Sequence, residues 1–260
     1  MMIEVKNVSK KFGKFTAVDD ISFKVEKGEI FAFLGPNGAG KTTTIKMLTT
    51  LLHQTSGQVF LDGHNVTENP SATRRSFGIV FQDPSLDNEL TAYENMQFHA
   101  ILYGISKKEY TERIKKLLDL VELTDRRDSY VKEFSGGMKR RLEIARGLLH
   151  NPKVLFLDEP TIGLDPQTRN HIWSYIRNLN KTENVTIFFT THHMEEVERS
   201  AQKIAIIDHG KIIEHGTSAE ILSKSGKDNL EDAFIFLTGR EIRKEESNFS
   251  RSTMRGMMGR

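Results

Sequence analysis

The stretch that decides the fold is KGEIFAFLGPNGAGKT, residues 27–42. Its last eight residues match the phosphate-loop pattern G-x-x-x-x-G-K-[ST], and the apolar run 30–34 before them predicts a strand. A helix is expected from about residue 41 to residue 52. Glycines let such a loop wrap its backbone N–H groups around phosphate oxygens at the positive end of that helix. The sequence therefore predicts a nucleotide-binding α/β domain.

The residue types within the loop suggest individual roles. We expect the Lys41 ammonium on the β- and γ-phosphates of ATP and the Thr42 hydroxyl on Mg²⁺. A glycine-rich turn with an incidental lysine is the alternative, and it does not explain the strand and helix patterns on either side. The positions expected to hold the nucleotide are Gly35, Pro36, Asn37, Gly38, Ala39, Gly40, Lys41, Thr42 and Thr43.

A second apolar run, VLFLDEP at 154–160, ends in two carboxylates. In sheets of this class, ligands bind at the carboxyl ends of the strands, where both side chains would emerge. Strand alternation directs them differently, so Asp158 fits the Mg²⁺ side and Glu159 fits a general base for attack on the γ-phosphate. Taken alone, the pair would more often be a helix cap or a surface pair. Its combination with a phosphate loop favours the catalytic interpretation.

Composition narrows the remaining function classes. The chain has 260 residues, 37 Lys and Arg against 35 Asp and Glu, a net charge of +2 and no cysteine. The charge balance gives no case for nucleic-acid binding, and the absence of cysteine excludes disulfides and thiolate metal sites. Apolar runs are strand-sized, well short of the roughly 20 residues that span a bilayer. We therefore expect a soluble chain whose membrane role requires a partner.

The pattern along the chain predicts an α/β core interrupted by an all-helical insertion. Strands are expected in GQVFLDG, GIVFQ, KVLFLDEP and VTIFFTTH, and KIAIIDHGKIIEHG predicts a hairpin turning at residues 208–210. The expected divisions are an ATPase domain at 1–222, its helical subdomain at about 86–150, a helical segment at 223–240 and a disordered tail at 241–260.

The stretch EFSGGMKRR, residues 133–141, predicts a second anion site far from the phosphate loop. Met138, Leu142, Ala145 and Leu149 follow a helical spacing, so Ser135 is a natural N-cap. The start of a helix also stabilises an anion through its dipole and free N–H groups. Capping alone and anion binding both remain open at this point.

With GPNGAGKT, FSGGMKRR and LDEPTIGLDP in this order, the chain resembles the ATP-binding-cassette ATPases over residues 3–222. The resemblance implies a P-loop NTPase core with a parallel sheet flanked by helices. It also implies an N-terminal antiparallel β part, an all-helical subdomain insertion and ATP hydrolysis with Mg²⁺. In this family Phe12 matches the aromatic residue that stacks on adenine, with Val18 beside it. A plain core aromatic is the alternative for Phe12.

The resemblance also implies roles that residue chemistry alone does not suggest. Gln82 matches the glutamine that contacts Mg²⁺ and the attacking water. His192, rather than its neighbour His193, matches the histidine that reaches the γ-phosphate. Asp165 matches the loop that crosses to a partner subunit. Ser135, Gly136 and Gly137 match the helix start that binds the γ-phosphate held by the other subunit, so each active site is completed in a dimer.

The residues on either side of Ser-Gly-Gly indicate a particular branch of this family. Phe134 and Met138 replace the family's usual leucine and glutamine, and basic residues follow. This resembles ATP-binding subunits of drug, lipid and polysaccharide exporters, including the daunorubicin-resistance type. The resemblance implies a homodimer or a dimer with a sister cassette, and a separate permease docking around residues 83–103. It also implies a cytoplasmic location at the membrane's inner face. A soluble ATPase acting on a macromolecular complex is the alternative.

Overall fold

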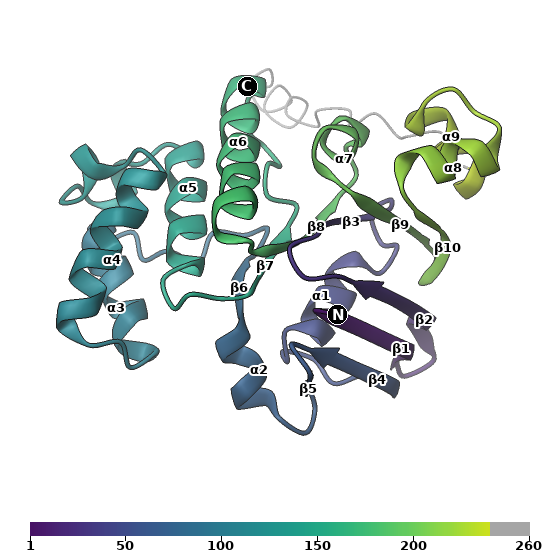
Figure 1. Cartoon of the computed structure of the whole chain (residues 1–260), viewed down its shortest axis with the longest axis horizontal. Coiled ribbons are helices and arrows are strands. Elements are labelled where there is room, and N and C mark those ends of the chain that lie inside the picture. Colours follow the sequence, from purple (N-terminus) through teal and green to yellow (C-terminus); the bar gives the residue numbers. More distant parts are fainter. Residues whose placement is uncertain (240–260) are drawn as a thin grey trace, which may run out of the picture.

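The computed structural model describes residues 1–239, and the predicted tail at 241–260 lies outside them. Two sheets form the centre, and a helical subdomain lies to one side (Figure 1). None of the helices within residues 1–239 has the length and apolar character that crossing a membrane requires. The predicted fold class, a P-loop NTPase core with both additions, is confirmed.

The central sheet has six strands in the order β10-β9-β3-β8-β7-β6. Its parallel strands pair as β9-β3, β3-β8, β8-β7 and β7-β6, while β10 pairs antiparallel with β9. The inner strands are buried on both faces, as their continuous apolar sequences require. The bounds are β3 (Ile30–Leu34), β6 (Phe77–Val80), β7 (Val154–Asp158), β8 (Thr186–Thr191), β9 (Lys203–Asp208) and β10 (Lys211–Gly216).

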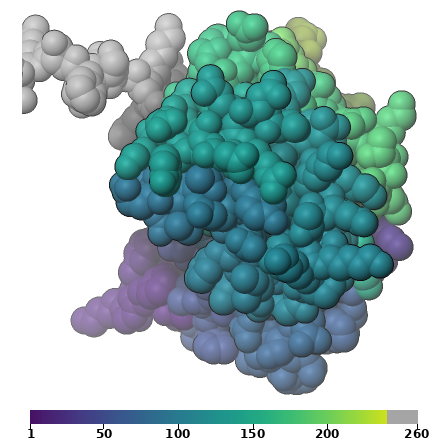
Figure 2. Space-filling model, turned by 90° about the vertical axis from the view of Figure 1, so that its left-hand side faces the viewer, coloured from purple at the N-terminus to yellow at the C-terminus, as the bar shows by residue number. Residues whose placement is uncertain are grey.

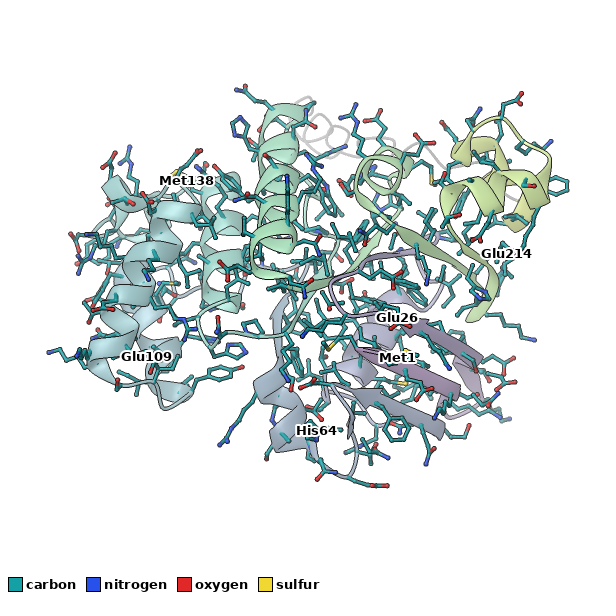
Figure 3. All side chains as sticks on the ribbon, viewed as in Figure 1. Met1, Glu26, His64, Glu109, Met138 and Glu214 are labelled. Atoms are coloured by element: carbon teal, nitrogen blue, oxygen red, sulfur yellow. The ribbon has the colours of Figure 1, made fainter. Side chains whose placement is uncertain are left out.

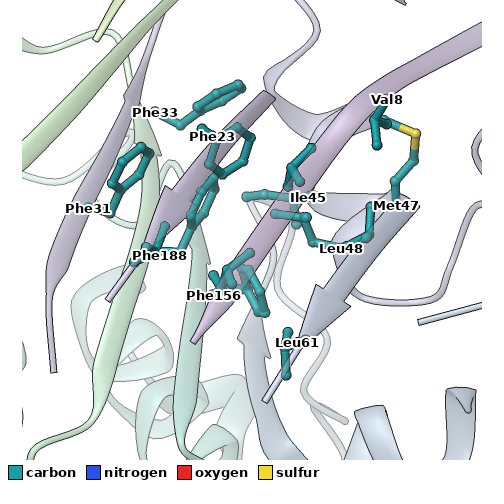
Figure 4. Close-up of a cluster of buried hydrophobic side chains, with 14 of the residues drawn as sticks. Val8, Phe23, Phe31, Phe33, Ile45, Met47, Leu48, Leu61, Phe156 and Phe188 are labelled. Carbon is teal, nitrogen blue, oxygen red and sulfur yellow. The ribbon is translucent and has the colours of Figure 1, made fainter. Parts of the chain in front are cut away.

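The N-terminal part forms an antiparallel sheet in the order β2-β1-β4-β5. Its strands are β1 (Ile3–Phe12), β2 (Phe15–Val25), β4 (Ser56–Leu61) and β5 (His64–Asn65). Aromatic side chains join the two sheets: the Phe23 ring stacks on Phe31 at 5.5 Å between centroids, and Phe31 stacks on Phe188 at 5.6 Å (Figure 4). This core includes Phe31 and Phe33 of β3 and Ala39 of the phosphate loop, so it supports both segments.

Helices cover the other face of the central sheet. Apolar residues of five helices pack there, and these helices are α5 (Gly136–Gly147), α6 (Pro166–Glu183), α7 (Met194–Ser200), α8 (Ser218–Ser225) and α9 (Leu230–Thr238). The C-terminal part of the described chain, from Ser218 to Thr238, is helical. It consists of two helices separated by the left-handed Gly226.

The helical subdomain has its own core, and it forms much of the molecular face shown in Figure 2. It contains α3 (Ala92–Leu102), α4 (Lys107–Leu120), two short 3₁₀ turns (Thr124–Arg126 and Val131–Glu133) and α5. Thr91 and Glu94 form a capping box at the start of α3, which satisfies two N–H groups reciprocally. The structure places no strand between residues 86 and 150, as the sequence predicted.

Two local expectations need adjustment, and a third is confirmed. Helix α1 (Lys41–Leu48) ends four residues earlier than expected, because Thr50 adopts a left-handed conformation with φ 62°. A short helix, α2 (Pro70–Ser76), was missed, although Pro70 at its first turn was an available signal. The hairpin turn was predicted correctly, and both His209 and Gly210 have the positive φ that such a two-residue turn needs.

Candidate nucleotide site

The phosphate loop connects the end of β3 to the start of α1. Gly40 has φ 108°, and a Cβ there would lie 2.7 Å from the Ala17 carbonyl oxygen, so only glycine fits. The first turn of a helix carries N–H groups without intrahelical partners. Among the α-helices of eight or more residues within 1–239, only α1 has no side-chain N-cap hydrogen bond. The loop therefore leaves this positive helix end available to an anion.

Lys41 is only 5% exposed and its ammonium is bound within the loop. Nζ donates to the carbonyl oxygens of Gly35 at 2.8 Å and Pro36 at 3.2 Å, and it lies 3.2 Å from Glu159 Oε1. A buried ammonium is stable only with such compensation. The same cation can satisfy phosphate oxygens in place of the carboxylate.

Glu159 contacts two other predicted site residues. Its Oε1 faces Lys41, and its Oε2 lies 3.3 Å from His192 Nδ1. Burial raises the pKa of this carboxyl, but the contacts with His192 and Lys41 outweigh burial and lower the pKa to about 2. Glu159 also has φ 46°, a left-handed conformation that is uncommon for a non-glycine residue and is often found at functional sites.

Thr190 contacts the carboxylate of Asp158 and the backbone of Glu159. Its hydroxyl donates to Asp158 Oδ1 at 2.6 Å and accepts from the Glu159 N–H at 3.0 Å. Asp158 and Thr190 are register partners on the parallel strands β7 and β8. Asp158 is 1% exposed, and the Glu159 carboxylate lies 3.2 Å from Lys41 of the loop, so the two side chains have different partners.

A cavity of about 370 Å³ opens over the loop, within the range of small-ligand sites. It brings together six of the predicted loop residues with Gln82 and Glu159, whereas Gly35, Pro36 and Ala39 do not line it. Its lining consists of Phe15, Ala17, Asn37, Gly38, Gly40, Lys41, Thr42, Thr43, Gln82 and Glu159. Backbone donors and a cation suit the phosphates of ATP, and the Thr42 hydroxyl suits a hard cation such as Mg²⁺.

The two phenylalanines near the phosphate loop, Phe12 and Phe15, differ in their surroundings. Phe12 is 48% exposed, does not line the cavity, and has the Lys10 ammonium 5.0 Å from its ring centroid. Phe15, its register partner at the turn between β1 and β2, lines the cavity instead. Val18 is fully buried and packs near Gly40. The sequence contained both phenylalanines, but only the turn between the strands decides which one faces the loop.

Gln82 lies in a segment that α5 holds firmly, which sequence reasoning missed. Arg140 donates to the carbonyl oxygens of Phe81 at 2.5 Å and Gln82 at 3.0 Å. Glu143, 3.3 Å from Arg140, accepts from the Ser85 N–H at 2.8 Å. Arg146 also donates to the Ser85 carbonyl oxygen, at 2.8 Å. The i, i+3, i+6 spacing of these three charged residues on one helix face was the available signal.

The Ser-Gly-Gly stretch lies against α6 in the described chain, and it does not line the cavity over the phosphate loop. Ser135 is the N-cap of α5, and its hydroxyl accepts from the Met138 N–H at 3.3 Å. A Cβ on Gly137 would lie 2.5 Å from Thr168 Cγ2 on α6. Asp165 caps α6 and accepts from the Thr168 hydroxyl at 2.6 Å. Figure 3 shows Met138 near the start of α5, in the helical part of the molecule.

The two adjacent histidines lie in different surroundings. His192 contacts Glu159, whereas His193 donates its backbone N–H to the Thr191 hydroxyl at 3.0 Å. Burial and the neighbouring His192 lower the pKa of His193. The structure thus places His192, the one chosen by resemblance, beside the other predicted catalytic residues.

A strand, phosphate loop and helix, together with paired carboxylates at the end of β7, another parallel strand of the same sheet, define the nucleotide site of a P-loop ATPase. The family model described as "ABC transporter" matches residues 18–162, and the chain belongs to this family. It is an ATPase that binds ATP with Mg²⁺ and serves as the ATP-binding subunit of a transporter.

Similar proteins support this assignment. The chain is 42% identical to the linearmycin resistance ATP-binding protein LnrL of Bacillus subtilis, over 88% of this chain and 73% of that protein. It is 42% identical to the daunorubicin/doxorubicin resistance ATP-binding protein DrrA of Streptomyces peucetius, over 88% and 69%. The dimeric structure of a post-hydrolysis state of the cassette MJ0796, bound to ADP and Pi, superposes with a TM-score of 0.75 at 28% identity, covering 83% of this chain and 98% of that one.

Proposed function

We propose that this chain supplies ATP hydrolysis to an exporter, as a dimer bound to separate permease subunits at the inner face of the cell membrane. The observation that carries the hydrolytic part is Glu159, which lies within 3.3 Å of both Lys41 and His192 at the cavity over the phosphate loop. The relatives named for resistance to linearmycin and to daunorubicin support the exporter branch. Outward transport of a toxic compound is a direct way for an ATP-driven subunit to confer resistance.

In this proposal ATP binding rearranges the Lys41 contacts. The β- and γ-phosphates replace the Gly35 and Pro36 carbonyl oxygens and the Glu159 carboxylate as partners of Nζ. Glu159 then accepts a proton from the water that attacks the γ-phosphate, and ADP and phosphate leave. Its low pKa in the described state reflects Lys41 and His192, so loss of the Lys41 contact raises its basicity. Thr42, Gln82 and Asp158 would hold Mg²⁺, which would supply positive charge to neutralise the phosphates.

The second anion site fits completion of the active site by a partner subunit. Ser135, Gly136 and Gly137 begin α5 beside α6, and the phosphate loop begins α1 on another side of the central sheet (Figure 1). A γ-phosphate bound by one chain's loop would therefore meet this helix start on another chain. Asp165, at the start of α6, belongs to the same proposed dimer surface.

The permease is proposed to dock with a short amphipathic helix in a groove on the helical subdomain. The groove has a volume of about 350 Å³ and is lined by Ser85, Asp87, Leu90, Asn95, Phe98, His99, Leu102 and Arg146. Phe98 is 60% exposed and Leu102 67%, so the groove edge presents apolar surface to a partner. Since Arg146 binds the Ser85 carbonyl and α5 also holds Gln82, the groove touches the segment that enters the nucleotide cavity.

The hydrolytic part is tested by Glu159→Gln and Ser135→Arg in the full chain. We expect Glu159→Gln to bind ATP, lose turnover by roughly 10²-fold or more, and form an ATP-dependent dimer on size-exclusion chromatography. Ser135→Arg alone should be inactive, and mixing it with Glu159→Gln should restore one competent site per dimer. Normal hydrolysis by Glu159→Gln contradicts the general base, and normal hydrolysis by Ser135→Arg contradicts completion by the partner.

The transport part is tested by Leu102→Glu, with Phe236→Glu as the matched control. Phe236 lies on α9 and is 60% exposed, close to the 67% of Leu102, but it is outside the groove. We expect only Leu102→Glu to abolish co-purification with the membrane protein encoded beside this chain and to remove its stimulation of the ATPase. Equal behaviour of the two variants contradicts the docking groove. A neighbouring gene without about six apolar spans would favour the soluble alternative.

A further inference from the structure

Glu196 is a buried carboxylate that the catalytic proposal does not use. It is 3% exposed and lies at the third position of α7, the helix that follows β8 and His192. A buried carboxylate is retained only when its oxygens receive hydrogen bonds or face a cation. The hydrogen-bond partners of Glu196 therefore identify the segments that it connects.

The Glu196 oxygens each receive a threonine hydroxyl from a different active-site segment. Thr191 Oγ1 donates to Oε2 at 2.8 Å, and Thr161 Oγ1 donates to Oε1. Thr191 precedes His192 directly, and Thr161 lies two residues after Glu159. Both threonines are 1% exposed, so water does not substitute for these bonds.

Hydrogen bonds close the backbone turns that contain His192 and Glu159. The Thr191 hydroxyl, while donating to Glu196, accepts from the His193 N–H at 3.0 Å, which closes the turn that contains His192. On the other segment, the Ile162 N–H donates to the Glu159 carbonyl oxygen at 3.3 Å. Glu196 thus joins the ends of two tight turns whose side chains meet 3.3 Å apart.

A third segment approaches the same carboxylate. Arg169 of α6 lies 3.8 Å from Glu196 Oε1. Helix α6 begins at its cap Asp165, the residue proposed to reach the partner subunit. Both helices pack on the same face of the central sheet (Figure 1). The carboxylate is therefore the common contact of the segments that carry Glu159, His192 and Asp165.

We propose that Glu196 is a positioning residue for ATP hydrolysis, which sets the distance between Glu159 and His192 by holding Thr161 and Thr191. It touches neither substrate nor metal and acts through the two hydroxyls. Because a 1 Å displacement of a catalytic group can lower a rate about 100-fold, losing either hydroxyl should reduce turnover far more than ATP binding. The inference rests on the proposed roles of Glu159 and His192.

The experiment compares threonine variants that differ only in the hydroxyl. Thr161→Val and Thr191→Val keep the shape and remove the donor, whereas Thr161→Ser and Thr191→Ser keep the donor. We expect the valine variants to lose kcat at least about 10-fold with ATP affinity within about threefold, and the serine variants to keep kcat within about threefold. Glu196→Ala should match the double valine variant, and Glu195→Ala, at the exposed neighbouring position, should keep full activity.

Three results would overturn the inference. The first is valine variants with normal kcat, and the second is a loss of ATP affinity in parallel with kcat. The third is a loss in the serine variants equal to that in the valine variants, which would indicate packing alone. Assays run well below each variant's melting temperature, so that unfolding does not imitate a catalytic loss. Glu159→Gln in the same assay separates the two ideas: if it hydrolyses ATP normally, the proposed catalytic base fails, whatever the threonines do.

Discussion

Replacement of Arg140 by methionine should destabilise the whole domain. Arg140 is 6% exposed and its partner Glu143 is 2% exposed. The substitution leaves the Glu143 carboxylate without its cation at 3.3 Å and removes the donor from the Phe81 and Gln82 carbonyl oxygens. Breaking a buried ion pair from one side costs about 3–5 kcal/mol. We expect the lower end, about 3 kcal/mol, because Glu143 still accepts from the Ser85 N–H.

Urea unfolding and thermal melting of the full chain measure this loss. For a domain of this size, about 3 kcal/mol corresponds to a melting temperature lowered by roughly 6–12 °C. The matched control is Lys132→Met, which removes an exposed pair with Glu89 and should leave the melting temperature almost unchanged. Adding Glu143→Met to Arg140→Met should cost less than Glu143→Met alone, by about 1 kcal/mol or more.

The reasoning about Arg140 is refuted if Arg140→Met is as stable as Lys132→Met. It is also refuted if the effects of Arg140→Met and Glu143→Met are additive. Either result would mean that the ion pair and the two carbonyl contacts do not hold the Gln82 segment on α5. Stability is the deciding measurement, because an ATPase loss alone could arise at Gln82 itself.

Other measurements address the phosphate loop, the start of α5 and the groove. Lys41→Ala should weaken ATP binding by about 2–4 kcal/mol in calorimetry, and an unchanged affinity would exclude the predicted phosphate contact. Gly137→Ala should lower the free energy of unfolding by about 1–3 kcal/mol, since the new Cβ would lie 2.5 Å from Thr168 Cγ2; Gly137→Ala with Thr168→Ser should recover most of this, and no recovery would reject the clash. Burial, Arg146 and His150 lower the pKa of His99 to about 4, so neutral His99 favours the folded state and stability should fall between pH 6.5 and pH 4. His99→Leu should remove roughly 2 kcal/mol of that fall, and identical pH profiles would contradict it.

The basic residues after Ser-Gly-Gly-Met show how far sequence reasoning reached. Ser135 as the N-cap of α5 was predicted from its residue type and is confirmed. The sequence suggested Met138 and its basic neighbours only as a mark of the exporter branch. In the structure Arg140 is buried and binds the backbone of the Gln82 segment, 58 residues earlier in the chain. A contact between segments so far apart leaves no local pattern, because it depends on how the helical subdomain packs on the central sheet.

The family resemblance implied the parallel sheet, and the sequence by itself determined the phosphate loop, the paired carboxylates and the helical insertion. These follow from local rules: glycine conformations, strand alternation, helical spacing and the order of motifs. Only the tertiary structure decided that Phe15 lines the cavity, that Glu159 contacts Lys41 and His192 together, and that Glu196 joins two catalytic turns. The physical reason is that these contacts join side chains from segments far apart in the sequence. The segments meet at the ends of neighbouring strands, and the number of residues between two segments does not give their distance in space.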